Sequence, residues 1–184
     1  MSVITPTLRE RQAPLKARYD ADPASAKLTM TVRSVTEGDE PTRCRIATGA
    51  PGSETDLAAW DVGAHPYAAG TGELACSGDL LLASLAACQE ITVRMVAAAM
   101  GITLQTVEVT VSGDLDFRGT MGIDPDAPVG FEAIRTDIRL ATDAPADRLQ
   151  RLARRAERYC VVASTLRQPP NLTTSIEVDT GAKA

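Results

Sequence analysis

The sequence is poor in aromatic residues, which make up 3% of its 184 residues. Its hydrophobic core must therefore be built mainly from leucine, valine, isoleucine and alanine. The chain also lacks an excess of positive charge, because its formal net charge at pH 7 is −5. Surfaces that bind nucleic acids or anionic membranes are generally basic, so the composition argues against both kinds of partner. The length suits one sizeable core, and we expect residues 1–184 to form a single domain.

Signals for export and for metal binding are also missing. The N-terminal residues contain no apolar run like that of a secretory signal peptide, so we expect a cytoplasmic protein. In that compartment the four cysteines are expected to be free thiols rather than structural disulfides. No two of them have the spacing of a zinc-binding pair, and the chain has a single histidine, His65. A nucleophilic cysteine–histidine pair that uses His65 remains an open alternative.

A long apolar stretch, Ser77–Met100, organises the rest of the chain. Strong helix formers fill it, Ser77 is a suitable N-cap and Gly101 a suitable end, so the stretch predicts one long helix. Apolar residues surround most of this helix, which indicates a central position in the fold with Cys88 at its middle. Three polar residues make the helix too interrupted to span a bilayer: Gln89, Glu90 and Arg94.

Alternation of apolar and polar residues predicts most of the strands. The predicted strands are Ala26–Val35, Arg43–Ala47, Leu104–Phe117, Phe131–Leu140 and Leu172–Val178, with a short apolar patch at Leu57–Val62 that is a further short strand at most. Strands that follow one another in pairs favour an antiparallel sheet and an α+β architecture.

Two further helices are predicted. Residues 1–25 form an N-terminal arm whose charged composition is helical. A second helix begins near Asp143, with the aspartate as its cap. It places Leu149, Leu152, Ala153, Ala156 and Cys160 on one apolar stripe.

Two segments, Leu81–Cys88 and Ala156–Leu166, resemble the OsmC/Ohr family, whose names stand for osmotically inducible protein C and organic hydroperoxide resistance protein. The resemblance covers residues 26–178 and indicates a divergent OsmC-like branch. It implies a strongly bent antiparallel sheet around a long central helix, and a homodimer of two interlocked chains. It also implies a thiol-dependent peroxidase that reduces organic hydroperoxides, has no cofactor and is regenerated by an external dithiol.

The resemblance also assigns roles to residues. Cys88 matches the peroxidatic cysteine and Cys160 the resolving cysteine of the family. Arg33 matches the arginine that activates the first cysteine, with Arg43 and Arg45 as alternatives. A thiolate must attack the peroxide, and burial raises a thiol pKa. Because Cys88 lies far from the start of its own helix, we expect an arginine to stabilise the thiolate.

Two positions depart from the family pattern. Gly78 stands where the peroxidases carry a glutamate that pairs with the arginine, and Val161 stands where many members have proline. The missing glutamate motivates an alternative function, a non-catalytic dimer that binds a small hydrophobic ligand. A third interpretation is that Cys88 and Cys160 only fill the core, because free cysteine is among the most buried residue types. The other two cysteines are expected to be structural, with Cys76 as an alternative resolving cysteine.

Overall fold

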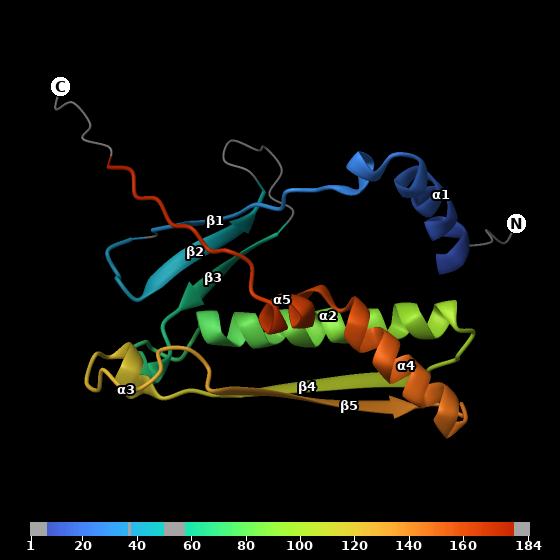
Figure 1. Ribbon diagram of the computed structural model, residues 1–184. Helices are drawn as coiled ribbons and strands as arrows, with labels where there is room; N and C mark the ends of the chain where they lie inside the picture. The colour runs from blue at the N-terminus through green and yellow to red at the C-terminus, as the bar shows by residue number, and fades with distance from the viewer. Residues whose placement is uncertain (1–6, 37, 50–57, 179–184) are drawn as a thin grey trace, which may run out of the picture.

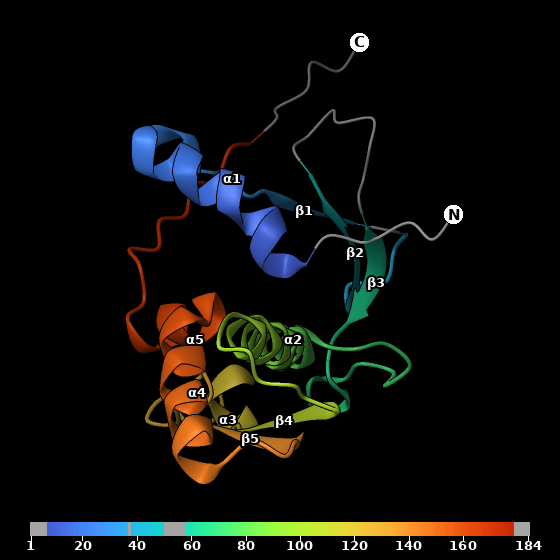
Figure 2. The same cartoon turned by 90° about the vertical axis from the view of Figure 1, so that its right-hand side faces the viewer.

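The long helix α2 (Ser77–Ala99) lies between two antiparallel sheets in the computed structural model (Figure 1 and Figure 2). The structure describes residues 7–36, 38–49 and 58–178. The α+β class and the antiparallel pairing are therefore confirmed. The other elements are α1 (Leu8–Ala21), η1 (Pro23–Ala26), β1 (Val32–Val35), β2 (Arg43–Thr48), β3 (Ala59–Gly63), η2 (Pro66–Ala68), β4 (Thr106–Asp114), α3 (Phe117–Thr120), β5 (Ala133–Ala141), α4 (Ala146–Tyr159) and α5 (Val161–Arg167).

The described strands form two separate sheets. One has the order β1-β2-β3, and the other is the long hairpin of β4 and β5, in which Val109 lies opposite Ile138. The short apolar patch after residue 57 forms β3, which completes the first sheet. The first predicted strand is shorter than expected, because Pro23 starts a 3₁₀ turn and β1 begins only at Val32.

The core lies where α2 crosses α4 above the β4–β5 sheet (Figure 2). Leu152 and Ala156 of α4 are buried against Val93 and Ala97 of α2, and Ile102 completes this cluster. The predicted stripe on α4 is thus confirmed at Leu152 and Ala156, whereas Ala153, which was predicted to lie on it, is exposed. All five residues of the cluster are aliphatic, as the shortage of aromatic residues predicts.

The ends of two helices differ from the prediction. The N-cap of α2 is Cys76 rather than Ser77, because the Cys76 sulfur accepts the Asp79 N–H at 3.5 Å and the Asp79 carboxylate accepts the Cys76 N–H at 2.9 Å. The predicted C-terminal end of α2 is confirmed, since Gly101 takes the left-handed conformation (φ 64°) that favours glycine after a helix. The predicted cap Asp143 is wrong, because Pro145 occupies the N-cap position of α4.

The predicted strand Leu172–Val178 is not formed. These residues belong to no helix or ladder within the described part of the chain, and the side chains of Leu172, Ile176 and Val178 are exposed. Alternation specifies two faces, but a strand also requires an edge to pair with. Among the described strands, none pairs with this segment.

Of the described helices, α2 alone is long and apolar enough to cross a membrane by length and composition. Core helices of soluble proteins have the same properties. Helix α2 packs on β4, α4 and α5, and 17% of its most apolar stretch is buried within the described structure.

Candidate functional site

The structure brings Cys88 and Cys160 together. Cys88 lies at the middle of α2, and Cys160 lies between the end of α4 and the start of α5. Cys160 is the N-cap of α5, and its sulfur accepts the Ala163 N–H at 3.5 Å. Cys88 packs against the small cluster that contains Cys160, and each thiol shifts the pKa of the other. Two segments far apart in the sequence therefore contribute one sulfur each to a shared site.

The two sulfurs differ in their access to solvent. Cys160 is 0% exposed and packs with Leu85 and Ala163 in a small apolar cluster. Cys88 is half-buried and lies at the edge of that cluster. A molecule that approaches from solvent meets Cys88 first.

Hydrogen bonds lower the pKa of Cys88 below the ordinary thiol value. Burial is the largest single influence and raises this pKa. The Val162 N–H, the Cys160 thiol and then the Val161 N–H act in the opposite direction, because each stabilises the thiolate. The hydroxyl of Thr92, one turn further along α2, lowers the pKa as well. Together these four groups outweigh the effect of burial.

The pKa of Cys160 moves the other way. Burial raises it most, and the Ala163 N–H lowers it by a smaller amount. The hydrogen bond and the charge of the neighbouring Cys88 raise it further, since a proton on Cys160 is held by the Cys88 thiolate. The pair therefore contains one acidic, accessible thiol and one weakly acidic, buried thiol.

The arginines predicted to activate Cys88 lie on the three-stranded sheet. Arg33 is half-buried on β1. In one protomer, the described groups that act on Cys88 come from α2 and from the α4–α5 junction. The role of Arg33 in activation stays a prediction. Arg43 and Arg45 each pair with a carboxylate of a neighbouring segment, Glu73 at 2.5 Å and Asp61 at 2.8 Å.

Sequence reasoning missed the start of α5. It considered only the N-terminus of α2, whereas the N–H donors near Cys88 come from a second helix that begins directly after Cys160. The valine at position 161, where many family members have proline, was the feature of the sequence that could have indicated these donors. Proline has no N–H, so Val161 supplies a donor that proline at this position would not.

An aromatic ring occupies the space beside the residue that replaces the family glutamate. A Cβ added to Gly78 would lie 3.3 Å from Cζ of Phe131, and one added to Gly113 would lie 2.6 Å from two atoms of the same ring. The nearest carboxylate, Asp79, accepts the Cys76 N–H, and this bond lowers the Asp79 pKa. The Asp79 carboxylate therefore caps the N-terminus of α2.

The remaining sequence candidates lie elsewhere. Nδ1 of His65 accepts the Tyr67 N–H at 3.1 Å, and its ring stacks on Phe117 with centroids 5.0 Å apart. This arrangement gives His65 a structural role at the loop before α2. Cys76 caps α2 twelve residues before Cys88, about 18 Å along the helix axis, which is too far for direct disulfide formation.

A groove runs behind the cysteine pair, between α2, β5 and the α4–α5 unit. It consists of two hollows of about 420 and 440 Å³ that share Gln89, Ile134, Thr136 and Arg167. Most of its other lining residues are apolar, and Leu85 and Ala163 separate it from Cys160. The Gln89 Oε1 atom is buried there and accepts no hydrogen bond from any described residue.

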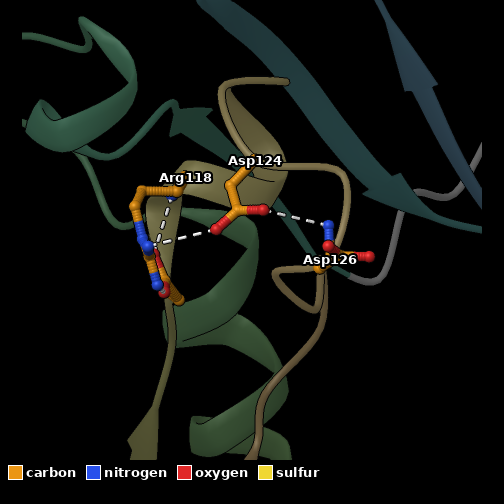
Figure 3. A network of polar contacts seen from close by, with 4 residues as sticks. Arg118, Asp124 and Asp126 are labelled. Atoms are coloured by element: carbon orange, nitrogen blue, oxygen red, sulfur yellow. Dashed lines mark hydrogen bonds and ion pairs between the residues drawn. The ribbon is translucent and has the colours of Figure 1, made fainter.

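The loop after β4 contains several carboxylates held by one guanidinium (Figure 3). Arg118 lies 2.6 Å from an oxygen of Asp116 and 3.1 Å from an oxygen of Asp124, whose other oxygen accepts the Asp126 N–H at 3.1 Å. These contacts fix the loop. Within residues 7–36, 38–49 and 58–178, no group of three or more histidine, cysteine, aspartate or glutamate side chains could hold a metal ion.

Comparison with known proteins gives a consistent assignment. The family model described as OsmC-like protein matches residues 70–175, more than half of the chain. No curated protein matches the sequence. Similar solved structures include an OsmC-like protein from Mycoplasma pneumoniae (TM-score 0.60, 17% identity, covering 78% of this chain and 90% of that one). Two others are described as organic hydroperoxide resistance proteins. The one from Legionella pneumophila has a TM-score of 0.55 and 19% identity, and the match covers 77% of this chain and 90% of that one. The one from Elizabethkingia anophelis has a TM-score of 0.53 and 13% identity, and the match covers 78% of this chain and 91% of that one. At these identities the likeness shows the fold.

Proposed function

The chain belongs to the OsmC-like protein family, and from this premise we propose that it is a thiol-dependent peroxidase that reduces organic hydroperoxides. The observation that carries the proposal is the contact between an accessible thiol of lowered pKa, Cys88, and a buried thiol of raised pKa, Cys160. Two structural relatives are described as organic hydroperoxide resistance proteins, which supports the proposed activity.

The proposed reaction uses both sulfurs in turn. The Cys88 thiolate attacks the terminal peroxide oxygen, the O–O bond breaks, and the alcohol leaves with a proton, so that Cys88 becomes a sulfenic acid. The Cys160 sulfur then attacks the Cys88 sulfur and displaces water, which forms a disulfide. An external dithiol reduces this bond by two exchange steps and is itself oxidised to a disulfide. One hydroperoxide and one dithiol are consumed in each cycle.

The surroundings of Cys88 favour an organic substrate. Ile91, one turn further along α2, is 53% exposed, and Val161 at the start of α5 is 72% exposed. Alkyl groups of a hydroperoxide gain free energy by covering such side chains, whereas hydrogen peroxide has no apolar surface to bury. We therefore expect alkyl and aryl hydroperoxides to be reduced faster than hydrogen peroxide.

We also propose that the protein works as a homodimer in the cytoplasm. Only 17% of the most apolar stretch of α2 is buried within one protomer. A water-soluble protein covers such a surface, and a second copy of the chain is the expected partner in this family. A reducing compartment supplies the external dithiol. Sedimentation at micromolar concentration tests the dimer, and a monomer would contradict it.

Steady-state turnover tests the proposed activity. The purified, reduced protein is mixed with cumene hydroperoxide and an excess of dithiothreitol, and loss of peroxide is followed. We expect turnover that Cys88→Ser abolishes and that Cys44→Ser, on β2, preserves. Equal rates for the wild-type protein and Cys88→Ser would reject the peroxidase.

A second candidate function is supported by the groove behind the cysteine pair. Its apolar lining and the buried, unsatisfied Gln89 oxygen suit a small hydrophobic ligand that carries one hydrogen-bond donor. This function predicts that organic extraction of the purified protein releases a ligand, that Gln89→Leu weakens its retention, and that no peroxide is turned over. Rapid turnover with a dithiol would contradict it.

A further inference from the structure

The groove behind the cysteine pair is one continuous channel along α2. Helix α2 lines its two hollows with four residues at intervals of four positions: Leu81, Leu85, Gln89 and Val93. Residues four apart are neighbours on a helix surface, so these side chains form an unbroken row, and the row covers about 18 Å of the helix axis. Residues between Phe131 and Leu140, most of them on β5, line the groove as well. The groove is therefore elongated.

The polar side chains of the groove gather where its two hollows meet. Gln89, Thr136 and Arg167 line both hollows. Beyond this shared part, each hollow is lined by apolar side chains and a single glutamate, which is Glu157 in one hollow and Glu132 in the other. The groove thus has a polar middle between two apolar arms.

Two features of the polar middle indicate which chemical group fits it. The Oε1 atom of Gln89 is buried and accepts no hydrogen bond from any described residue, so a ligand that donates a hydrogen bond would satisfy it. The guanidinium of Arg167 pairs with the Glu157 carboxylate at 2.6 Å, so its charge is compensated. A ligand carboxylate would be repelled by Glu157, whereas a neutral group would not. The middle therefore favours a neutral hydrogen-bond donor over an anion.

We propose that the groove binds a neutral ligand in which a secondary amide joins two aliphatic chains. The amide N–H donates to Oε1 of Gln89, the Thr136 hydroxyl and the Arg167 guanidinium offer donors to the amide carbonyl, and one chain fills each hollow. An extended chain gains about 1.2 Å per bond, so a ligand of about a dozen bonds fits the length of the groove. The inference rests on the groove of the second candidate function and names its ligand class. It does not depend on peroxide turnover, because apolar side chains separate the groove from Cys160.

Equilibrium dialysis against the reduced full-length protein tests the proposal with three probes. N-hexylhexanamide carries the amide and two alkyl chains, hexyl hexanoate replaces the N–H by an ester oxygen at the same length, and dodecanoate carries a carboxylate. We expect the amide to bind and the dodecanoate anion to bind about tenfold more weakly. No binding of the amide, or binding of the carboxylate that is as strong as that of the amide, overturns the proposal.

The variant Gln89→Leu isolates the proposed hydrogen bond. Amide and ester also differ in hydration, so the informative quantity is the ratio of their affinities, compared between the wild-type protein and the variant. Leucine keeps much of the side-chain volume and removes the acceptor, so we expect the preference for the amide to fall about three- to tenfold. An unchanged ratio overturns the proposal.

The variant Ile138→Asp tests where the alkyl chains lie. Ile138 lines one hollow and is 41% exposed, so the fold should tolerate a charge there, whereas binding of the amide should weaken about tenfold. Ile123→Asp is the matched control, because Ile123 is also exposed and does not line the groove. Equal affinities of these two variants for the amide overturn the proposal. Thermal unfolding of each variant confirms that it is folded.

Peroxide turnover separates this inference from the proposed function. Cys88→Ser should bind the amide as tightly as the wild-type protein, and a loss of binding would place the probe at the cysteine pair and overturn the proposal. Turnover of cumene hydroperoxide by a wild-type protein that does not bind the amide overturns the proposal and leaves the peroxidase standing. Binding of the amide by a wild-type protein without turnover supports the proposal and rejects the peroxidase.

Discussion

Cys88 on α2 packs against the cluster that contains Cys160 at the α4–α5 junction, and the interaction of the two thiols lowers the pKa of Cys88 and raises that of Cys160. This interaction stabilises the Cys88 thiolate and the protonated form of Cys160. In the proposed peroxidase reaction, this division favours nucleophilic attack by Cys88 and keeps Cys160 protonated until a sulfenic acid forms beside it. Solvent access leads to the same assignment, because Cys160 is fully buried.

The pH dependence of alkylation should reflect this division. Because the folded-state pKa of Cys88 is lowered, its alkylation rate should rise with pH and reach half its maximum below the value found for the same cysteine in urea, about 8.5. Cys160 should titrate above that value and react slowly, since its pKa is raised and its sulfur is buried. Peptide-resolved alkylation rates between pH 5 and 10 provide the measurement. The reverse order of reactivity would contradict the assigned roles.

Val161→Pro should raise the Cys88 pKa by about half a unit. Proline removes the N–H that acts on the Cys88 sulfur. The backbone accepts the change, because Val161 is the first residue of α5 and Cys160 already has the extended conformation (φ −76°, ψ 110°) that precedes proline. Val161→Ala keeps the N–H and is the control. Equal pKa values in both variants would show that this N–H does not act on the sulfur.

Cys76→Ser should keep both stability and disulfide formation. The Cys76 sulfur caps α2, and a serine hydroxyl is a stronger acceptor for the Asp79 N–H. Cys76→Ala should lower the free energy of unfolding by about 1 kcal/mol, because one N–H of the first turn loses its partner. Urea denaturation and thiol titration after peroxide treatment measure both effects. Loss of the disulfide in Cys76→Ser would instead make Cys76 a resolving cysteine.

Gly113→Ala should lower the free energy of unfolding by about 1–3 kcal/mol. Its Cβ would lie 2.6 Å from the Phe131 ring, so the ring must move. In a Phe131→Ala background the same substitution should cost little, because the clashing atoms are gone. A double-mutant cycle by urea denaturation measures the difference. An equal cost in both backgrounds would show that the ring does not occupy this space.

The sequence predicted those features that depend on local pattern. The length of α2, its end at Gly101, the β4–β5 hairpin and the apolar stripe on α4 all follow from periodicity and helix-ending residues. Cys88 and Cys160 were singled out by the family resemblance, since spacing does not show that two distant thiols meet.

Features that depend on a tertiary partner were missed or wrong. Leu172–Val178 has the alternation of a strand, but no described strand of the same protomer pairs with it. The donors at Cys88 come from α5, whose start becomes relevant only when the chain folds back on α2. The role of Phe131 beside Gly78 and Gly113 likewise depends on packing between distant segments.

Disulfide mapping after one equivalent of cumene hydroperoxide tests the central claim most directly. The reduced protein is treated, blocked with an alkylating agent and digested without reductant. The account predicts that two of the four thiols disappear and that the peptides containing Cys88 and Cys160 are linked to each other within one chain. Four intact thiols, or a linkage that omits either of these two cysteines, would contradict it.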